Sequence, residues 1–161
     1  MPLPPVAHLL NFHDMIVRLM VGAALGVAIG FEREWRNRGA GVQTTGLVAT
    51  GGALFCVTGP ALGIGGGDSL RVVQSVAQGV GFLAGGVILK EGLNVTGLNT
   101  AATLWATAAV GSLAGVGLMR EAVVGALSIL ALNLVFLPLV EGLNRRFRAS
   151  HPPSHKLDGT S

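Results

Sequence analysis

Residues 15–31 read MIVRLMVGAALGVAIGF, an apolar run that only Arg18 interrupts. Its length approaches the roughly 20 residues that a helix needs to cross the hydrocarbon core of a bilayer. No basic segment precedes the run, and the charged stretch EREWRNR of residues 32–38 follows it in place of a small-residue cleavage site. A secretory signal peptide would need both a basic segment before the apolar run and a small-residue cleavage site after it. We therefore predict a retained membrane helix here.

Four more apolar runs follow along the chain, and the five occupy residues 15–31, 41–62, 72–89, 100–118 and 122–140. They predict an all-α fold, a polytopic membrane helix bundle of about five transmembrane helices in one domain over residues 15–140. Residues 1–14 form an N-terminal segment, and we expect 141–161 to be a basic cytoplasmic tail that is disordered at its end. A glycine-rich turn at 63–68 and a polar link at 94–99 are the predicted connections.

The composition agrees with a membrane protein. Of 161 residues 50% are hydrophobic and 12% are charged, about half the charged share of an average soluble domain. The mean hydropathy is +0.63. Such a chain has too little charge to cover a soluble globule and too many apolar residues for disorder. The net charge of +3 is scattered in short clusters, which does not suggest nucleic-acid binding.

Basic residues predict the orientation in the membrane. With five spans, the first loop, the third loop and the C-terminal tail share one side and hold eight of the 11 lysines and arginines, while the other side holds three. This bias predicts a cytoplasmic C-terminus and an external N-terminus. The eight are Arg33, Arg36, Arg38, Lys90, Arg145, Arg146, Arg148 and Lys156, and the three are Arg18, Arg71 and Arg120.

Glycines recur at a spacing of four in three of the runs, which predicts close helix packing. Four residues are about one helical turn, so each set lies on one helix face and lets another backbone approach. Packing within the bundle is the first interpretation, and homodimerisation through one of these faces is the second. The glycines are Gly22, Gly26 and Gly30, then Gly81 and Gly85, then Gly111 and Gly115.

Polar residues gather on the predicted cytoplasmic side. Glu32 lies only two residues beyond Gly30, where a charge is costly and tends to serve a function. The plainer interpretation is a solvated helix end, with Glu32 and Arg36 paired at i,i+4. Asn99 could simply cap the fourth helix. Alternatively, a cluster of Glu32, Arg33, Glu91 and Asn99 holds a cation, a lipid headgroup or a partner protein. In the fifth run, Asn133 is expected to form an interhelical hydrogen bond.

The sequence offers no catalytic arrangement, so we expect no enzyme, no cofactor and no metal site. All four histidines lie in the terminal segments, and the single Cys56 leaves no cysteine–histidine zinc set. Residues 65–68, GGGD, are similar to the motif of intramembrane aspartyl proteases, but a second intramembrane aspartate is missing. A dinucleotide-like pattern at 79–84 lies inside an apolar helix and lacks the strand that such a site needs.

Three linked segments resemble the signature of the MgtC/SapB family of bacterial membrane proteins, and the resemblance covers about residues 18–133. The positions carried over are Glu32, Arg33, Arg38, Gly41, Thr44, Glu91 and Asn99, and we take these, without Gly41, as the candidate partner- or ion-binding residues. Gln43 stands where the family usually has an arginine, and the C-terminal soluble domain of better-known members is not expected here. The segments are GFEREWRNRGAGVQTTGLVATG at 30–51, GFLAGGVI at 81–88 and GLNVTGLNTAATLW at 92–105.

The resemblance implies a multi-pass protein of the bacterial inner membrane that is linked to growth at low magnesium and to survival inside host cells. It also implies a regulator that binds other membrane proteins, the ATP synthase among them. Glycine-mediated packing adds the expectation of a homodimer. The alternative is a small transporter or channel for an ion or small solute, because Glu32 and Glu91 are plausible carboxylates for an ion path.

Overall fold

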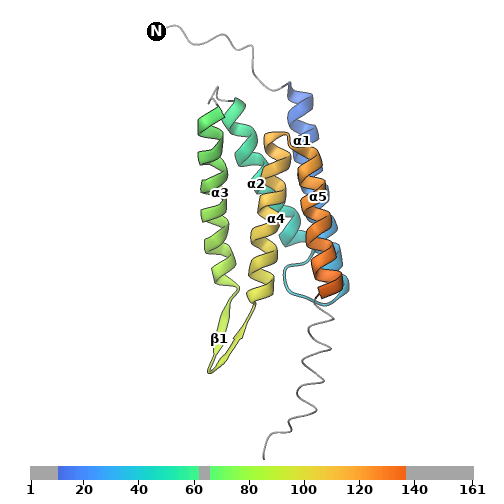
Figure 1. Cartoon of the computed structure of the whole chain (residues 1–161), viewed down its shortest axis with the longest axis vertical. Helices are drawn as coiled ribbons and strands as arrows, with labels where there is room; N and C mark the ends of the chain where they lie inside the picture. The colour runs from blue at the N-terminus through green and yellow to red at the C-terminus, as the bar shows by residue number, and fades with distance from the viewer. Residues whose placement is uncertain (1–10, 62–65, 137–161) are drawn as a thin grey trace, which may run out of the picture. The chain divides into compact units, whose positions relative to one another are not determined.

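The computed structural model of the chain describes residues 11–61 and 66–136. In those ranges an all-α fold is confirmed, with one short β-hairpin between the third and fourth helices (Figure 1). The elements are α1 Phe12–Trp35, α2 Val42–Ala61, α3 Gly66–Gly86, β1 Leu89–Glu91, β2 Asn94–Thr96, α4 Leu98–Val116, α5 Met119–Ala131 and the π-helical turn η1 Leu132–Phe136.

Two compact units make up the chain, Met1–Ile129 and Leu130–Ser161. The first holds α1 to α4, the hairpin and most of α5. The described part of the second holds the end of α5 and the turn η1, which contains Asn133. The interhelical hydrogen bond expected of Asn133 stays a prediction. The expected tail at 141–161 and most of the N-terminal segment lie outside the described residues.

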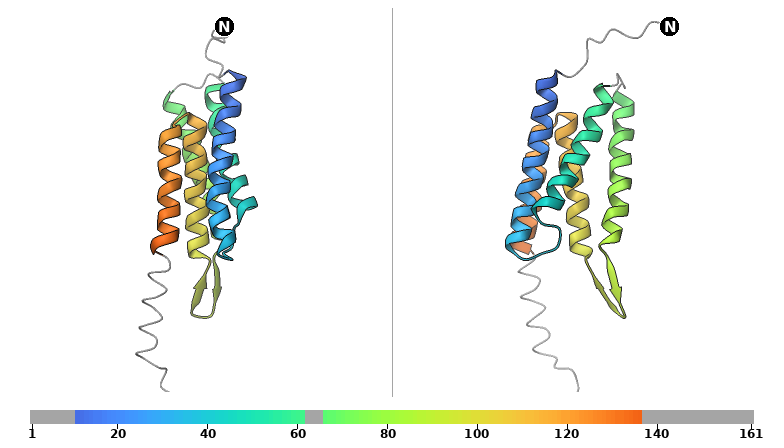
Figure 2. Two further views of the ribbon diagram at one scale, coloured as in Figure 1. Left: turned by 90° about the vertical axis from the view of Figure 1, so that its right-hand side faces the viewer. Right: turned by 180° about the vertical axis from the view of Figure 1, so that it is seen from behind.

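Helices α1, α2 and α4 pack against one another and form the centre of the first unit, and α3 packs on α2 and α4 (Figure 2). Small residues fill the contacts. A Cβ added to Gly111 of α4 would overlap the Ala49 carbonyl oxygen of α2, and one added to Gly26 of α1 would lie 2.7 Å from the Thr45 carbonyl oxygen. Backbones that approach so closely tolerate only glycine at the contact.

The same close contacts occur along the rest of the two glycine faces on α1 and α4. A Cβ at Gly22 would lie 3.1 Å from the Ala53 Cβ, and one at Gly115 would lie 2.6 Å from the Ala53 carbonyl oxygen. At Gly30 an added Cβ would overlap the Thr45 hydroxyl. Both faces therefore turn toward α2.

In α3 the expectation of close packing within the bundle is wrong. A Cβ added to Gly81 or Gly85 would meet nothing within 4 Å. Both glycines are exposed, on a face that turns away from α2 and α4. Spacing in the sequence places residues on a common face, but it does not say what that face contacts.

Large apolar side chains cover the outside of the described helices. Phe82 is 85% exposed, and exposed apolar residues occur on every helix, among them Phe31, Leu47 and Trp105. A water-soluble monomer rarely carries so much exposed apolar surface, whereas a lipid-facing bundle requires it. Of the described helices, α1 alone is long and apolar enough to cross a membrane, and the apolar part of α2, Val42–Thr58, is shorter. The expected count of five spans stays a prediction.

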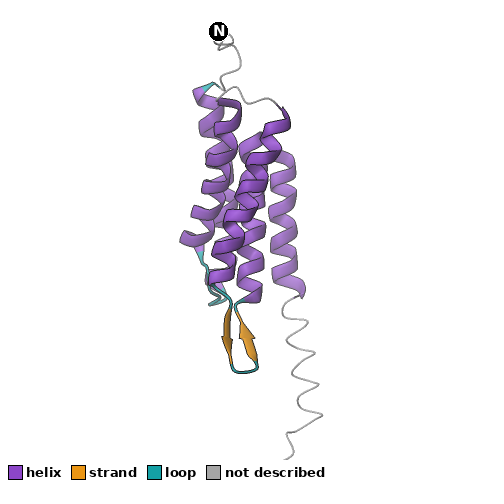
Figure 3. Cartoon of the chain, turned by 90° about the vertical axis from the view of Figure 1, so that its left-hand side faces the viewer, coloured by secondary structure: helices purple, strands orange, loops and turns teal. Residues whose placement is uncertain are grey.

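Between α3 and α4 the chain forms a hairpin that the sequence analysis missed (Figure 3). The helix ends at Gly86 instead of continuing to residue 89, and β1 pairs antiparallel with β2, with Lys90 opposite Val95. Gly92 takes a φ of +61° in the two-residue turn, as a primed hairpin turn requires at its first position. The expected turn at 63–68 also differs. Residues 63–65 lie outside the described ranges, and 66–68 already belong to α3.

Candidate functional site

Arg33 lies at the point where the end of α1, the loop that follows it and the start of α4 meet. Its side chain is 1% exposed. Nη1 donates to the Thr103 hydroxyl at 3.0 Å, and Nη2 donates to the Thr100 hydroxyl at 2.9 Å. Nε donates to the carbonyl oxygens of Gly39 at 2.9 Å and Ala40 at 3.2 Å. The guanidinium thus joins the loop to α4, and we call these five residues the Arg33 cluster.

Backbone conformation explains why the loop carbonyls face Arg33. After α1 ends at Trp35, Asn37 and Ala40 take left-handed φ angles of 52° and 58°. Asparagine tolerates this conformation better than most residues and often ends a helix in this way. The backbone N–H of Asn37 donates to the Glu34 carbonyl oxygen at 3.0 Å, and the chain then reverses into α2. The reversal brings two main-chain acceptors back toward the last turn of α1.

Only neutral acceptors receive the hydrogen bonds that Arg33 makes in the described structure. The Thr103 hydroxyl accepts from Arg33 and itself donates to the Asn99 carbonyl at 2.9 Å. A buried ionised group is tolerated only when hydrogen bonds replace the water that it has lost. Because these bonds are internal, we assign Arg33 a positioning role within the fold rather than direct contact with a partner.

Glu32 is buried as well, but its environment differs. The residue is 8% exposed, and both carboxylate oxygens are buried and accept no hydrogen bond from the described residues. The Arg36 guanidinium lies 3.7 Å from Oε1, in the expected i,i+4 pairing. That distance allows an ion pair but exceeds hydrogen-bond length. Glu32 therefore keeps acceptor capacity that a cation or a hydrogen-bond donor could use.

The other candidate residues are spread over the same end of the first unit. Arg38 lies in the loop and is partly buried, while Thr44 in the first turn of α2 is exposed, as is Gln43. The backbone of Glu91 pairs with Asn94 in the hairpin. Asn99 is exposed at the second position of α4. The structure thus brings Arg33 together with Thr100 and Thr103, and not with the side chain of Asn99.

The expectation that Asn99 caps α4 is wrong, because Gly97 is the N-cap residue. Gly97 has a φ of +85°, and a Cβ there would overlap the Val87 carbonyl oxygen. The tight exit from the hairpin requires glycine at this position. Helix α4 therefore begins before Asn99, whose side chain is left at the surface.

Two polar contacts escaped the sequence analysis. Thr100 and Thr103 share one face of α4 at a spacing of three, and this was the available signal for the Arg33 cluster. At the opposite end of α4, the Arg18 Nη1 donates to the Gly115 carbonyl at 3.0 Å. A cation at a helix C-terminus satisfies end carbonyls and complements the helix dipole. The signal for this contact was a lone arginine inside an apolar run.

Within residues 11–61 and 66–136, no three histidine, cysteine, aspartate or glutamate side chains come close enough to hold a metal ion. Cys56 is a buried free thiol in α2. The polar groups that remain as a candidate site at this end of the first unit are the Arg33 cluster and the carboxylate of Glu32.

Comparison with known proteins finds relatives over most of the chain. The model of the MgtC family matches residues 19–142. An uncharacterized protein of Synechocystis sp. is 45% identical over 149 residues, which cover 92% of this chain and 61% of that protein. Protein MgtC of Brucella abortus is 46% identical over 136 residues, covering 83% and 57% of the two chains. Protein MgtC of Salmonella typhimurium is 40% identical over 130 residues, covering 81% and 55%.

The chain thus spans little more than half the length of the curated relatives that it matches. No solved structure matches it. The matched region contains the whole of α2 to α5, the hairpin and the Arg33 cluster.

Proposed function

The chain belongs to the MgtC family, whose members are membrane-associated, and from this premise we propose that it regulates other membrane proteins by binding them. In this proposal it is a multi-pass protein of the bacterial inner membrane with a cytoplasmic C-terminus. It catalyses no reaction and is linked to magnesium homeostasis, to growth at low magnesium and to survival inside host cells. The ATP synthase is one candidate partner.

One observation carries this proposal, a stripe on the outer face of α3. Gln74, Gln78, Gly81 and Gly85 recur at spacings of four, three and four, so they lie along one face of the helix, and all four are exposed. We call this face the α3 stripe. Its two glycines leave space for another backbone. Amide side chains facing lipid gain hydrogen bonds when a second helix supplies the partners.

The α3 stripe suits a transmembrane helix of a partner protein. Glycines at i,i+4 permit close approach, and glutamines on the same face add hydrogen bonds across the contact. A second copy of the chain could dock in the same way, which would give the homodimer expected from the glycine spacing. The mass of a cross-linked product distinguishes the two occupants.

Cross-linking in the native membrane tests this proposal. A photoreactive residue at position 78 is compared with one at position 124, because Val124 is exposed on α5 away from the stripe. We expect an adduct with a second membrane protein from position 78, and its loss in the Gly81→Leu variant. Equal adducts from both positions, or none from position 78, would contradict the proposal. An adduct with the mass of two copies would identify a homodimer.

The polar end of the first unit is proposed as a second contact with the partner. Glu32, whose carboxylate keeps acceptor capacity, and Asn99, which is exposed, are the residues to test there. The other candidate residues, Arg38, Thr44 and Glu91, lie around the same end. We expect Glu32→Ala or Asn99→Ala to abolish recovery of the partner while the protein still inserts into the membrane. Normal recovery with both variants would count against this contact.

A transporter or channel is the second candidate function, and the buried carboxylate of Glu32 favours it. Its two oxygens accept no hydrogen bond within the described structure, so a cation or a proton could occupy the site. Magnesium or proton flux into proteoliposomes, lost in a Glu32→Ala/Asn99→Ala double variant, would establish transport. Absence of flux from folded protein would leave regulation as the better-supported function.

A further inference from the structure

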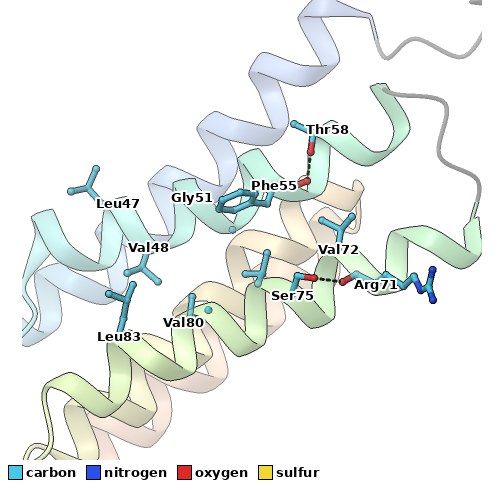
Figure 4. Close-up of a pocket in the computed structure, with 13 residues that line it drawn as sticks. Leu47, Val48, Gly51, Phe55, Thr58, Arg71, Val72, Ser75, Val80 and Leu83 are labelled. Atoms are coloured by element: carbon cyan, nitrogen blue, oxygen red, sulfur yellow. Dashed lines mark hydrogen bonds between the residues drawn. The ribbon is translucent and has the colours of Figure 1, made fainter.

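Helices α2 and α3 leave a groove of about 790 Å³ between them (Figure 4). Apolar side chains and glycines line most of it, including Val48, Phe55, Val76 and Val80. Gly51 and Gly79 widen it, because a Cβ at either position would meet nothing within 4 Å. The volume falls in the range of about 300–1,000 Å³ that is common for small-molecule sites.

The polar groups of the groove lie at one end. Figure 4 places Thr58 and Arg71 there, and Leu47 and Leu83 at the other end. The Thr58 hydroxyl donates to the Phe55 carbonyl at 2.6 Å, and the Ser75 hydroxyl donates to the Arg71 carbonyl at 2.9 Å. Both hydroxyl protons are thus used within their own helices. Arg71, which is exposed, supplies the positive charge at this end of an otherwise apolar groove.

The length of the groove discriminates between occupants. Along α2 its lining runs from Leu47 to Thr58, which at 1.5 Å per residue is about 17 Å. A single leaflet contributes about half of the roughly 30 Å hydrocarbon core, so a lipid acyl chain matches this length. A transmembrane helix would need a groove nearly twice as long.

From charge, shape and length, we propose that the groove binds an acyl chain of an anionic phospholipid whose phosphate contacts Arg71. This inference rests on the proposed embedding of the chain in the bilayer. The guanidinium provides planar donors that match phosphate oxygens, and Gly51 and Gly79 make room for the chain. Gly79, which makes room for the acyl chain, lies on the other side of α3 from Gly81 and Gly85 of the α3 stripe. Arg71 lies at the end of that stripe, three residues before Gln74. The acyl chain and the glycine contact of a partner helix therefore use different faces of α3.

Native mass spectrometry of the purified full chain tests the site, with phosphatidylglycerol and phosphatidylethanolamine supplied in equal amounts. We expect the protein to retain one phosphatidylglycerol per chain. Gly79→Leu fills the groove and should remove the bound lipid. Arg71→Gln should lower the preference for phosphatidylglycerol about fivefold, the effect of one basic residue at an anionic lipid surface.

Matched controls separate this site from general lipid contact. Gly81→Leu adds the same side chain to the opposite face of α3, and Arg120→Gln removes an exposed charge from α5. Both should retain lipid as the wild type does. Equal lipid retention in all variants would overturn the inference. An unchanged preference for phosphatidylglycerol in Arg71→Gln would overturn it as well. Circular dichroism of Gly79→Leu verifies that its helices remain folded.

The two proposals fail in different ways. If an alkaline wash releases the chain from membranes, the proposed embedding is wrong and the lipid site is wrong with it. If the chain stays in the membrane but retains no phosphatidylglycerol, the lipid site alone is wrong. A Gly79→Leu variant that keeps its lipid but loses a cross-link to a second copy would make the groove a protein interface instead.

Discussion

At the scale of single residues, the two buried charges at the end of α1 differ in their hydrogen bonding. Arg33 is joined to Thr100, Thr103 and the loop carbonyls, whereas the Glu32 carboxylate oxygens accept no hydrogen bond from the described residues. Neighbours in the sequence thus differ in what they can offer a ligand. Arg33 stabilises the fold, and Glu32 is the group that retains capacity for binding.

Replacing Arg33 by lysine should therefore destabilise the protein although the charge is kept. Lysine has no planar fork and cannot reach two threonines and the loop carbonyls together. We expect a loss of about 1.5–3 kcal/mol in the free energy of unfolding, the contribution typical of a hydrogen bond to a charged group. Denaturant titration in detergent measures it. Arg120→Lys, at an exposed position, is the control, and an equal, small effect of both variants would contradict the positioning role.

The sequence could predict that residues 32–38 are important, because so dense a charged stretch next to an apolar run is unusual in a membrane helix. It could not predict that Glu32 and Arg33 are the two charges that are buried, or that only Arg33 finds hydrogen-bond acceptors. That depends on the left-handed conformations of Asn37 and Ala40 and on where α4 begins. Both are set by tertiary contacts, which a periodic pattern of apolar residues within one helix does not report.

At the scale of elements, the glycine spacing predicted faces correctly but not their contacts. The faces on α1 and α4 meet α2, whereas the glycines on α3 face outward. The helices were visible as long apolar runs. The hairpin was missed because strands of three residues are too short to show a period of two.

A pair of alanine substitutions measures this difference. Gly111→Ala would place a methyl group against the Ala49 carbonyl and force α4 away from α2. Overpacking of this kind costs about 1–3 kcal/mol. Gly81→Ala meets open space and should not destabilise the protein, because alanine favours a helix more than glycine does. Thermal unfolding in detergent compares the two variants. Similar melting temperatures would show that the contact between α2 and α4 tolerates a methyl group at position 111.

At the scale of the whole molecule, the charge bias from which we predict the orientation needs correction for arginines held inside the fold. Arg33 bonds to α4 and the loop, and Arg18 bonds to the end of α4. Without these two, the counts of eight and three basic residues become seven and two. The bias toward a cytoplasmic loop, hairpin and tail is unchanged, because one charge is removed from each side.

Cysteine labelling of the connections tests that orientation. The tip of the hairpin, Leu93, is 101% exposed, and Leu118 is exposed between α4 and α5. Single cysteines at these two positions, in a Cys56→Ala background, face opposite ends of α4. In right-side-out vesicles a membrane-impermeant maleimide should label position 118 and spare position 93 until the vesicles are opened. The reverse pattern would invert the topology, and would place Glu32 and the Arg33 cluster on the external side, where they could not contact the cytoplasmic face of a partner membrane protein.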